Sequence, residues 1–129
     1  MIRIKDLEKK VDERGFLVEV IKDYEVGKKF GQFMVTTAKP GKVKGNHYHK
    51  RKHEYYCVIK GKCKLAVVDN KTGKREEVIL SGDRPQLVTI NPNVSHAVQN
   101  VGSVNMYLLI YIDESFDPSD PDTFRSKVL

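Results

Sequence analysis

Residues 41–61, GKVKGNHYHKRKHEYYCVIKG, place three histidines and one glutamate between two glycines. Successive side chains of a strand point to opposite faces, so His47 and His49 share a face and can reach one ion. On a strand that begins at Glu54, this carboxylate lies on one face and His53 on the other. We therefore expect His47, His49 and Glu54 to bind a metal and His53 to lie outside the site.

The fourth histidine, His96, follows the turn residues Asn91-Pro92-Asn93 at the start of another predicted strand. It would approach the same ion from the opposite sheet. Three imidazoles and one carboxylate suit Mn, Fe, Ni, Cu or Zn and leave coordination positions open for water or substrate. The sequence thus predicts a divalent transition metal at His47, His49, Glu54 and His96.

Short β-rich runs recur along the chain between turn residues, and no helix-length window has apolar spacing of three and four. Strands of this length and spacing suit a sandwich or a double-sheet barrel, so the chain is predicted to be all-β. The predicted strands cover residues 16–21, 32–38, 54–59, 62–69, 76–80, 86–90, 96–100 and 105–112.

The bulk composition is that of a soluble globular chain. Its 129 residues, 31% charged and 40% hydrophobic, suit one domain. The N-terminus lacks the apolar stretch of a signal peptide, and the longest apolar run, residues 106–112, is too short to span a bilayer. We expect a cytoplasmic protein with no membrane partner.

The charge is unevenly distributed. Of a net charge of +6, residues 39–64 carry nine Lys or Arg against one acid, whereas residues 113–122 carry five acids and no base. The basic stretch coincides with the first histidines, which suggests attraction of a phosphate-bearing ligand, a solvated lysine-rich surface being the alternative. Since no aromatic-plus-basic motif is present, we expect no nucleic-acid partner.

Cys57 and Cys63 flank a predicted turn at Lys60-Gly61, so strand geometry could bring them together. A cytosolic setting favours free thiols. A disulfide stays open as the alternative.

Several of these residues carry a resemblance to the cupin superfamily. The residues that match its first motif are Gly41, His47, His49, Glu54 and Gly61, and those that fit its second are Pro92, His96 and Asn100. At Asn93 the chain departs from the usual glycine, although Asn tolerates the same left-handed backbone. The resemblance implies a double-stranded β-helix, a jelly-roll barrel with the metal inside, and commonly a homodimer.

On this basis residues 1–129 form a single cupin domain. We expect residues 1–30 to supply N-terminal strands at a dimer interface and residues 31–112 to form the barrel core. Residues 113–129 should be an irregular acidic tail that wraps a neighbour or frays.

Narrower likenesses concern function. The segment DERGFLVE, residues 12–19, resembles the opening strand of the dTDP-4-dehydrorhamnose 3,5-epimerases and sugar 3,4-ketoisomerases. Residues 45–50, 100–106 and 116–124 resemble the cupin half of bifunctional capsular-polysaccharide enzymes, in which a reductase precedes a metal-binding epimerase cupin. The resemblance implies an epimerase or isomerase of a dTDP- or UDP-linked 4-keto-6-deoxy sugar, here without the reductase. The metal would be Zn, Mn, Fe or Ni.

The resemblance also implies catalytic residues. In the metal-free members the histidine equivalent to His47 acts as the base, yet a histidine that holds a metal cannot also accept a proton, so both roles stay open. Tyr107 and Tyr111 lie near the place where the 3,5-epimerases have an acid tyrosine. Core packing is the alternative for both tyrosines.

Four further residues are candidates for substrate binding. Arg14 and Lys44 could pair with the diphosphate. Tyr48 and Tyr56 could stack on a nucleobase or sugar, with core packing as the alternative.

Because cupins host many reactions, two other functions stay open. One is an iron-dependent dioxygenase. The other is a non-catalytic sugar-binding or sensor module.

Overall fold

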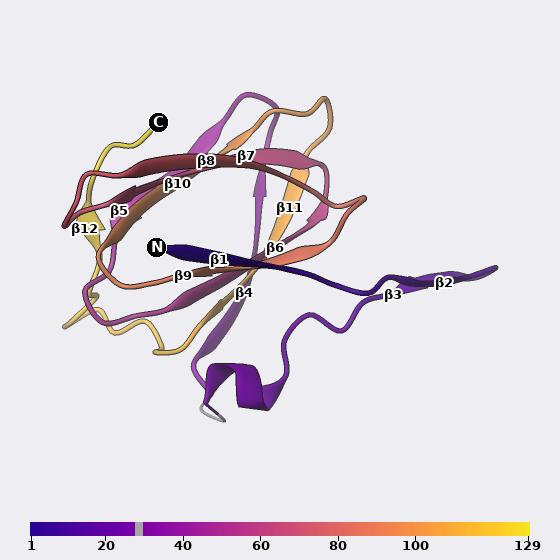
Figure 1. Ribbon diagram of the computed structural model, residues 1–129, viewed down its shortest axis with the longest axis horizontal. Coiled ribbons are helices and arrows are strands. Elements are labelled where there is room, and N and C mark those ends of the chain that lie inside the picture. The colour runs from indigo at the N-terminus through magenta and orange to yellow at the C-terminus, as the bar shows by residue number, and fades with distance from the viewer. Residues whose placement is uncertain (28–29) are drawn as a thin grey trace.

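Two five-stranded antiparallel sheets face each other in the computed structural model, which describes residues 1–27 and 30–129 (Figure 1). The first sheet contains, in order, β1 (Ile2–Asp6), β9 (Gln86–Ile90), β6 (Glu54–Lys60), β11 (Met106–Ile112) and β4 (Gln32–Ala38). The second contains β12 (Phe124–Arg125), β5 (Val43–Tyr48), β10 (Val94–Asn100), β7 (Lys62–Asp69) and β8 (Arg75–Ser81). The predicted all-β double-sheet barrel is confirmed.

The core lies between the two sheets and follows from the alternation of each strand. Val58 and Leu108 of the first sheet meet Leu65 and Val67 of the second, and all four are at most 2% exposed. Fully burying one such side chain contributes about 1.5–3 kcal/mol to folding. This core fixes which face of each strand can carry an internal site.

The strands predicted at residues 32–38, 62–69 and 86–90 have those ends in the structure, and four others agree within two residues. The strand predicted at residues 16–21 is wrong beyond Leu17, because β3 (Gly15–Leu17) pairs only with β2 (Lys10–Asp12). β1 was not predicted and extends the barrel beyond residues 31–112 by pairing with β9.

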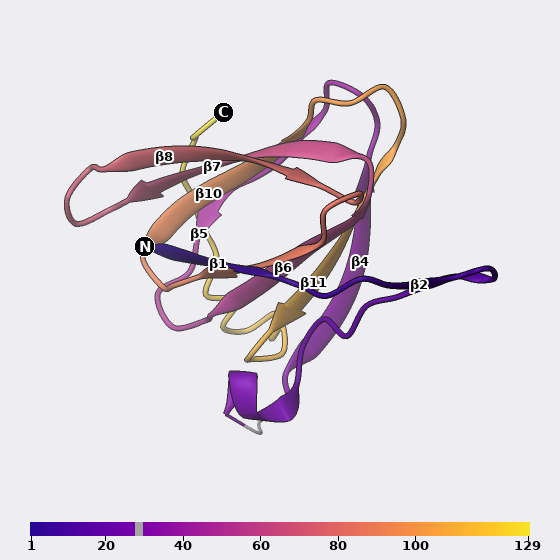
Figure 2. The same cartoon turned by 45° about the vertical axis from the view of Figure 1, so that its right-hand side comes forward.

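The β2–β3 hairpin projects away from the barrel in both views (Figures 1 and 2). Three apolar side chains on it are largely exposed, Val11 at 70%, Phe16 at 58% and Leu17 at 56%. A short 3₁₀ turn, η1 (Asp23–Val26), follows before β4. Within the described residues, no helix is both long and apolar enough to cross a membrane.

The acidic C-terminal segment folds back onto its own barrel, which corrects the expectation that it frays or wraps a neighbour. β12 pairs with β5, and Asn46 Oδ1 accepts hydrogen bonds from the backbone of Val128 at 2.7 Å and of Leu129 at 3.0 Å. These bonds satisfy backbone groups that fraying would expose.

Candidate metal centre

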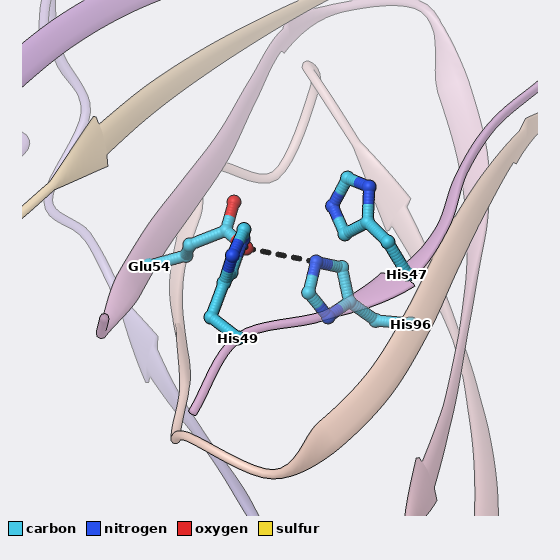
Figure 3. Close-up of side chains that lie close together, drawn as sticks. All are labelled: His47, His49, Glu54 and His96. Atoms are coloured by element: carbon cyan, nitrogen blue, oxygen red, sulfur yellow. Dashed lines mark ion pairs between the residues drawn. The ribbon is translucent and has the colours of Figure 1, made fainter. Parts of the chain in front are cut away.

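The four predicted ligands converge between the two sheets (Figure 3). His47 lies on β5, His49 directly follows that strand, Glu54 begins β6 and His96 lies on β10. One ligand atom from each lies within 4.8 Å of the others. Two facing sheets therefore bring together residues up to 49 positions apart, as the strand faces predicted.

The converging atoms make no hydrogen bonds elsewhere in the described chain. Glu54 Oε1 lies 2.6 Å from His49 Nε2 and 2.9 Å from His96 Nε2, and Glu54 is 3% exposed. Neither contact has hydrogen-bond geometry: across the described chain, Oε1 and the three histidine Nε2 atoms lack a hydrogen-bond partner. Because buried polar atoms are rarely left unsatisfied, the residues fit a divalent metal ion that would take all four.

The opposite ring nitrogens of two ligands are held by backbone carbonyls. His49 Nδ1 lies 2.6 Å from the Asp122 carbonyl oxygen, and His96 Nδ1 lies 2.9 Å from that of Val94. A carbonyl oxygen only accepts, so each Nδ1 carries a hydrogen, and Nε2 is the ring nitrogen left to bind a metal once it has lost any proton. The tautomers are those that metal binding requires.

The protonation states also suit a metal. Burial, reinforced by His96, lowers the pKa of His47 to about 4, so His47 is neutral at neutral pH. Burial would raise the pKa of Glu54, but its contacts with His49 and His96 outweigh burial and hold that pKa well below its usual range. An ionised carboxylate and a neutral imidazole are ready to coordinate.

A bulge in β5 brings Lys44 to the same side as His47. His47 is paired with His96 and Lys44 with Val98, with a register shift between them. Lys44 and His47 are three apart, so simple alternation would separate them, but the extra residue restores the shared face. Lys44 Nζ donates to Thr36 Oγ1 at 2.7 Å, which links β5 to β4 at the edges of the two sheets.

Three of the ligands, His47, His49 and Glu54, line a pocket of about 270 Å³. Lys52 and Tyr56 line it as well. Tyr56 is 4% exposed, and its ring lies edge-on to that of His96 with centroids 5.9 Å apart. Of the four predicted substrate-binding residues, Tyr56 lies in the pocket wall and Lys44 near the sheet edges. The remaining wall residues are Gln32, Met34, Ile110, Ile112, Phe116 and Thr123.

Neither Tyr107 nor Tyr111, the two tyrosines predicted to be catalytic, lines this pocket. The inward face of β11 carries Met106, Leu108 and Ile110, and the tyrosines alternate with them. Tyr107 is 38% exposed, and the Tyr111 hydroxyl accepts a hydrogen bond from the Gly31 amide at 2.8 Å. Strand parity thus directs both rings out of the barrel.

The other two predicted substrate-binding residues, Tyr48 and Arg14, make their contacts elsewhere in the chain. Tyr48 stacks on Phe124 with ring centroids 5.3 Å apart, on the face of β5 opposite His47. Arg14 lies at the tip of the projecting hairpin, with its side chain 85% exposed and 2.6 Å from Asp12. Neither residue lines the pocket.

Two other predictions concern residues outside the metal set. His53 Nδ1 lies 2.9 Å from Asp113 Oδ2 and apart from the four ligands, in line with its predicted face. Cys57 and Cys63 are free, buried thiols; Cys63 belongs to the core between the sheets, whereas Cys57 does not.

Sequence reasoning missed two buried charged residues at the site, Lys52 and Asp122, each 3% exposed. Lys52 lies between the ligands His49 and Glu54 in the sequence. This position could have indicated that it lies close to the metal site. Asp122 lies in a segment that composition marks as irregular, so nothing local indicated its burial.

Two facing antiparallel sheets with three histidines and a glutamate between them define a cupin, as the two sequence motifs indicated. The chain belongs to the polysaccharide biosynthesis C-terminal domain family, which matches residues 10–124.

Individual relatives agree with this membership. The chain is 35% identical over 117 residues to UDP-2-acetamido-2,6-beta-L-arabino-hexul-4-ose reductase of Pseudomonas aeruginosa, covering 91% of this chain and 30% of that protein. The crystal structure of the capsular polysaccharide assembling protein CapF from Staphylococcus aureus matches with a TM-score of 0.75 and 34% identity, over 95% of this chain and 34% of CapF. The chain therefore spans about a third of the length of these two relatives.

A dTDP sugar isomerase from Desulfovibrio desulfuricans shares the fold, with a TM-score of 0.88 at 18% identity over 98% of this chain and 84% of the isomerase. Together with the family match, these likenesses confirm the resemblance to epimerase-type cupins and to the cupin part of capsular-polysaccharide enzymes.

Proposed function

We propose that this cupin binds a divalent transition metal and epimerises or isomerises a nucleotide-linked 4-keto-6-deoxy sugar in the synthesis of a surface polysaccharide. The observation that carries the proposal is the convergence of four ligand atoms, three of them from residues that line a pocket of about 270 Å³. The Pseudomonas relative supports it, because its name specifies a UDP-linked hexul-4-ose. The dTDP sugar isomerase supports a nucleotide sugar in the same fold.

The chemistry starts from the C4 ketone, which acidifies the hydrogen on C3. When the C3–H bond breaks, its electron pair forms a C3–C4 double bond and the carbonyl pair moves to the C4 oxygen. Return of a proton to the other face inverts C3. A bound metal would supply Lewis-acid polarisation of the ketone.

Two cations of the chain suit such a substrate. Lys52 is buried in the pocket wall, where its ammonium would stabilise the negative charge that develops on the C4 oxygen. Lys44, near the edges of the two sheets, would pair with the diphosphate.

The base for the C3 proton depends on the metal. In the metal-free protein His47 is a neutral imidazole at neutral pH, and its unprotonated ring nitrogen can accept this proton. In the loaded protein the same lone pair is used for coordination. Comparing chelator-treated protein with protein reloaded with Zn, Mn, Fe or Ni assigns the role: activity without metal makes His47 the base, and activity only after reloading makes it a ligand.

The experiment is hydrogen exchange in deuterated water with dTDP- and UDP-linked 4-keto-6-deoxy sugars. Deuterium should enter at C3 or C5 and be detected by proton NMR and mass spectrometry. Absence of exchange with all of these sugars, in both metal-free and metal-loaded protein, would overturn the proposed function.

We also propose that the chain forms a homodimer through its projecting hairpin. An isolated two-stranded hairpin is marginally stable in water, and this one exposes apolar side chains. A second copy would cover them.

A further inference from the structure

Asp122 is the one buried residue of the segment from Ser115 to Leu129, all of which the structure describes. It is 3% exposed and has a left-handed backbone with φ of 48°. For a residue other than glycine this conformation costs about 1–2 kcal/mol. Burial and strain at a single acidic position indicate that its contacts compensate for both.

The Asp122 carboxylate holds the loop that joins two metal ligands, His49 and Glu54. Its Oδ1 accepts a hydrogen bond from the Lys50 amide at 3.0 Å, and its Oδ2 accepts from the amides of Arg51 at 2.9 Å and Lys52 at 3.3 Å. The Asp122 carboxylate therefore fixes three consecutive backbone amides.

The Asp122 backbone acts on the ligand itself. Its carbonyl oxygen lies 2.6 Å from His49 Nδ1, which must therefore donate. With a hydrogen on Nδ1, Nε2 is the ring nitrogen that faces Glu54 Oε1, 2.6 Å away. Without this acceptor, the imidazole of His49 could exchange tautomers and rotate.

The preceding residue extends the same arrangement to the pocket. The Pro121 carbonyl accepts a hydrogen bond from Lys52 Nζ at 3.1 Å. Two consecutive carbonyls thus orient one metal ligand and one pocket cation, and both depend on how the Asp122 carboxylate docks the segment.

We propose that Asp122 is a positioning residue of the metal centre, whose carboxylate docks the C-terminal segment on residues 50–52 so that its own carbonyl fixes the tautomer of His49. Asp122 contacts neither metal nor substrate. The proposal rests on the metal site of the proposed function, but its effect on His49 is measurable without metal.

The test compares Asp122→Ala and Asp122→Asn with Asp120→Asn as the matched control. Asp120 lies in the same segment, but its side chain is 62% exposed and pairs only with Arg51 among the described residues. Long-range proton–nitrogen NMR on metal-free protein, at a pH high enough for His49 to be neutral, should show His49 protonated at Nδ1 in the wild type and in the control. In Asp122→Ala it should show both tautomers.

Zinc affinity, measured by competition with a chelator, gives the second readout. Loss of a partner that orients a metal-binding histidine typically weakens metal binding about 10–100-fold, and we expect this for Asp122→Ala. The control should bind zinc like the wild type. If Asp122→Ala does not fold, Asp122→Asn tests the proposal instead. Its side-chain amide keeps one acceptor oxygen, so we expect a zinc affinity between those of the wild type and a full loss, and both tautomers of His49.

A single Nδ1-protonated tautomer and wild-type zinc affinity in the folded Asp122 variants would overturn the proposal. If the wild type itself does not bind zinc, the metal centre of the proposed function fails with that metal. The tautomer measurement then still decides whether Asp122 orients His49.

Discussion

Glu54 approaches the imidazoles of His49 and His96, which belong to the opposite side of the barrel. Its carboxylate supplies the negative charge among the four predicted metal ligands. Glu54→Gln keeps the shape but removes the charge and one strong ligand atom. We expect zinc binding to weaken at least about 100-fold while the fold persists, since loss of a residue that only orients a ligand already costs about 10–100-fold. Elemental analysis and chelator competition measure this, with His53→Gln as the control; equal metal loss in both variants would contradict the assigned faces.

Lys52 provides a prediction about the reaction rather than the metal. Lys52→Met should lower the rate of deuterium exchange about 10²–10³-fold, because it removes a charged donor from the pocket. Zinc affinity should change little. Lys50→Met is the matched control, since Lys50 is exposed and its Nζ lies 4.4 Å from the centre of the Phe124 ring, outside the pocket. Equal exchange rates in the two variants would remove Lys52 from the mechanism.

The contrast between these two residues explains what the sequence could predict. The face of Glu54 follows from local alternation along β6, which the sequence displays directly. The burial of Lys52 depends on a carbonyl 69 residues away, at Pro121, and on the docking of a segment without periodicity. Local patterns therefore predicted the ligands but not the residues that surround them.

At the scale of elements, the bulge in β5 sets the direction of the first two ligands. Gly45 has φ of 100°, and a Cβ there would lie 3.0 Å from the His96 carbonyl oxygen. Gly45→Ala should therefore destabilise the protein by about 2–4 kcal/mol, from backbone strain together with this close contact. Urea unfolding measures the change.

Gly73→Ala is the control that separates the cost of backbone strain from the cost of the close contact at Gly45. Gly73 also has a positive φ, 76°, but nothing lies within 4 Å of its added Cβ, so only about 1–2 kcal/mol should be lost. If Gly45→Ala costs no more than Gly73→Ala, the close packing of β5 on His96 does not constrain the site.

The elements also show why some strands escaped prediction. β4 and β9 are rich in β-branched residues and their ends were predicted, whereas β5 contains glycine and asparagine and is held mainly by pairing with β10. Tyr107 and Tyr111 were assigned by their proximity to a family position. Their true direction follows from the alternation of β11, whose inward face is occupied by aliphatic residues.

At the scale of the whole molecule, the pocket and the projecting hairpin belong to different parts of the surface. The outward face of edge strand β4 exposes Phe33 at 51% and Val35 at 59%, and the hairpin exposes Phe16 at 58%. These three apolar side chains lie on surfaces that packing within one chain does not cover. A second copy of the chain is the proposed cover, so the quaternary structure is testable apart from the catalytic proposal.

The dimer predicts a particle of twice the 14.8 kDa chain mass in sedimentation equilibrium. Phe16→Glu should shift it to the monomer, because a charge would be buried without a partner in the interface. Ile79→Glu is the matched control: Ile79 is similarly exposed, at 55%, but lies on β8 of the other sheet. Zinc binding should persist in the Phe16 variant, since all four ligands come from one chain. A monomeric wild type, or equal dissociation by both substitutions, would contradict a dimer built on the hairpin.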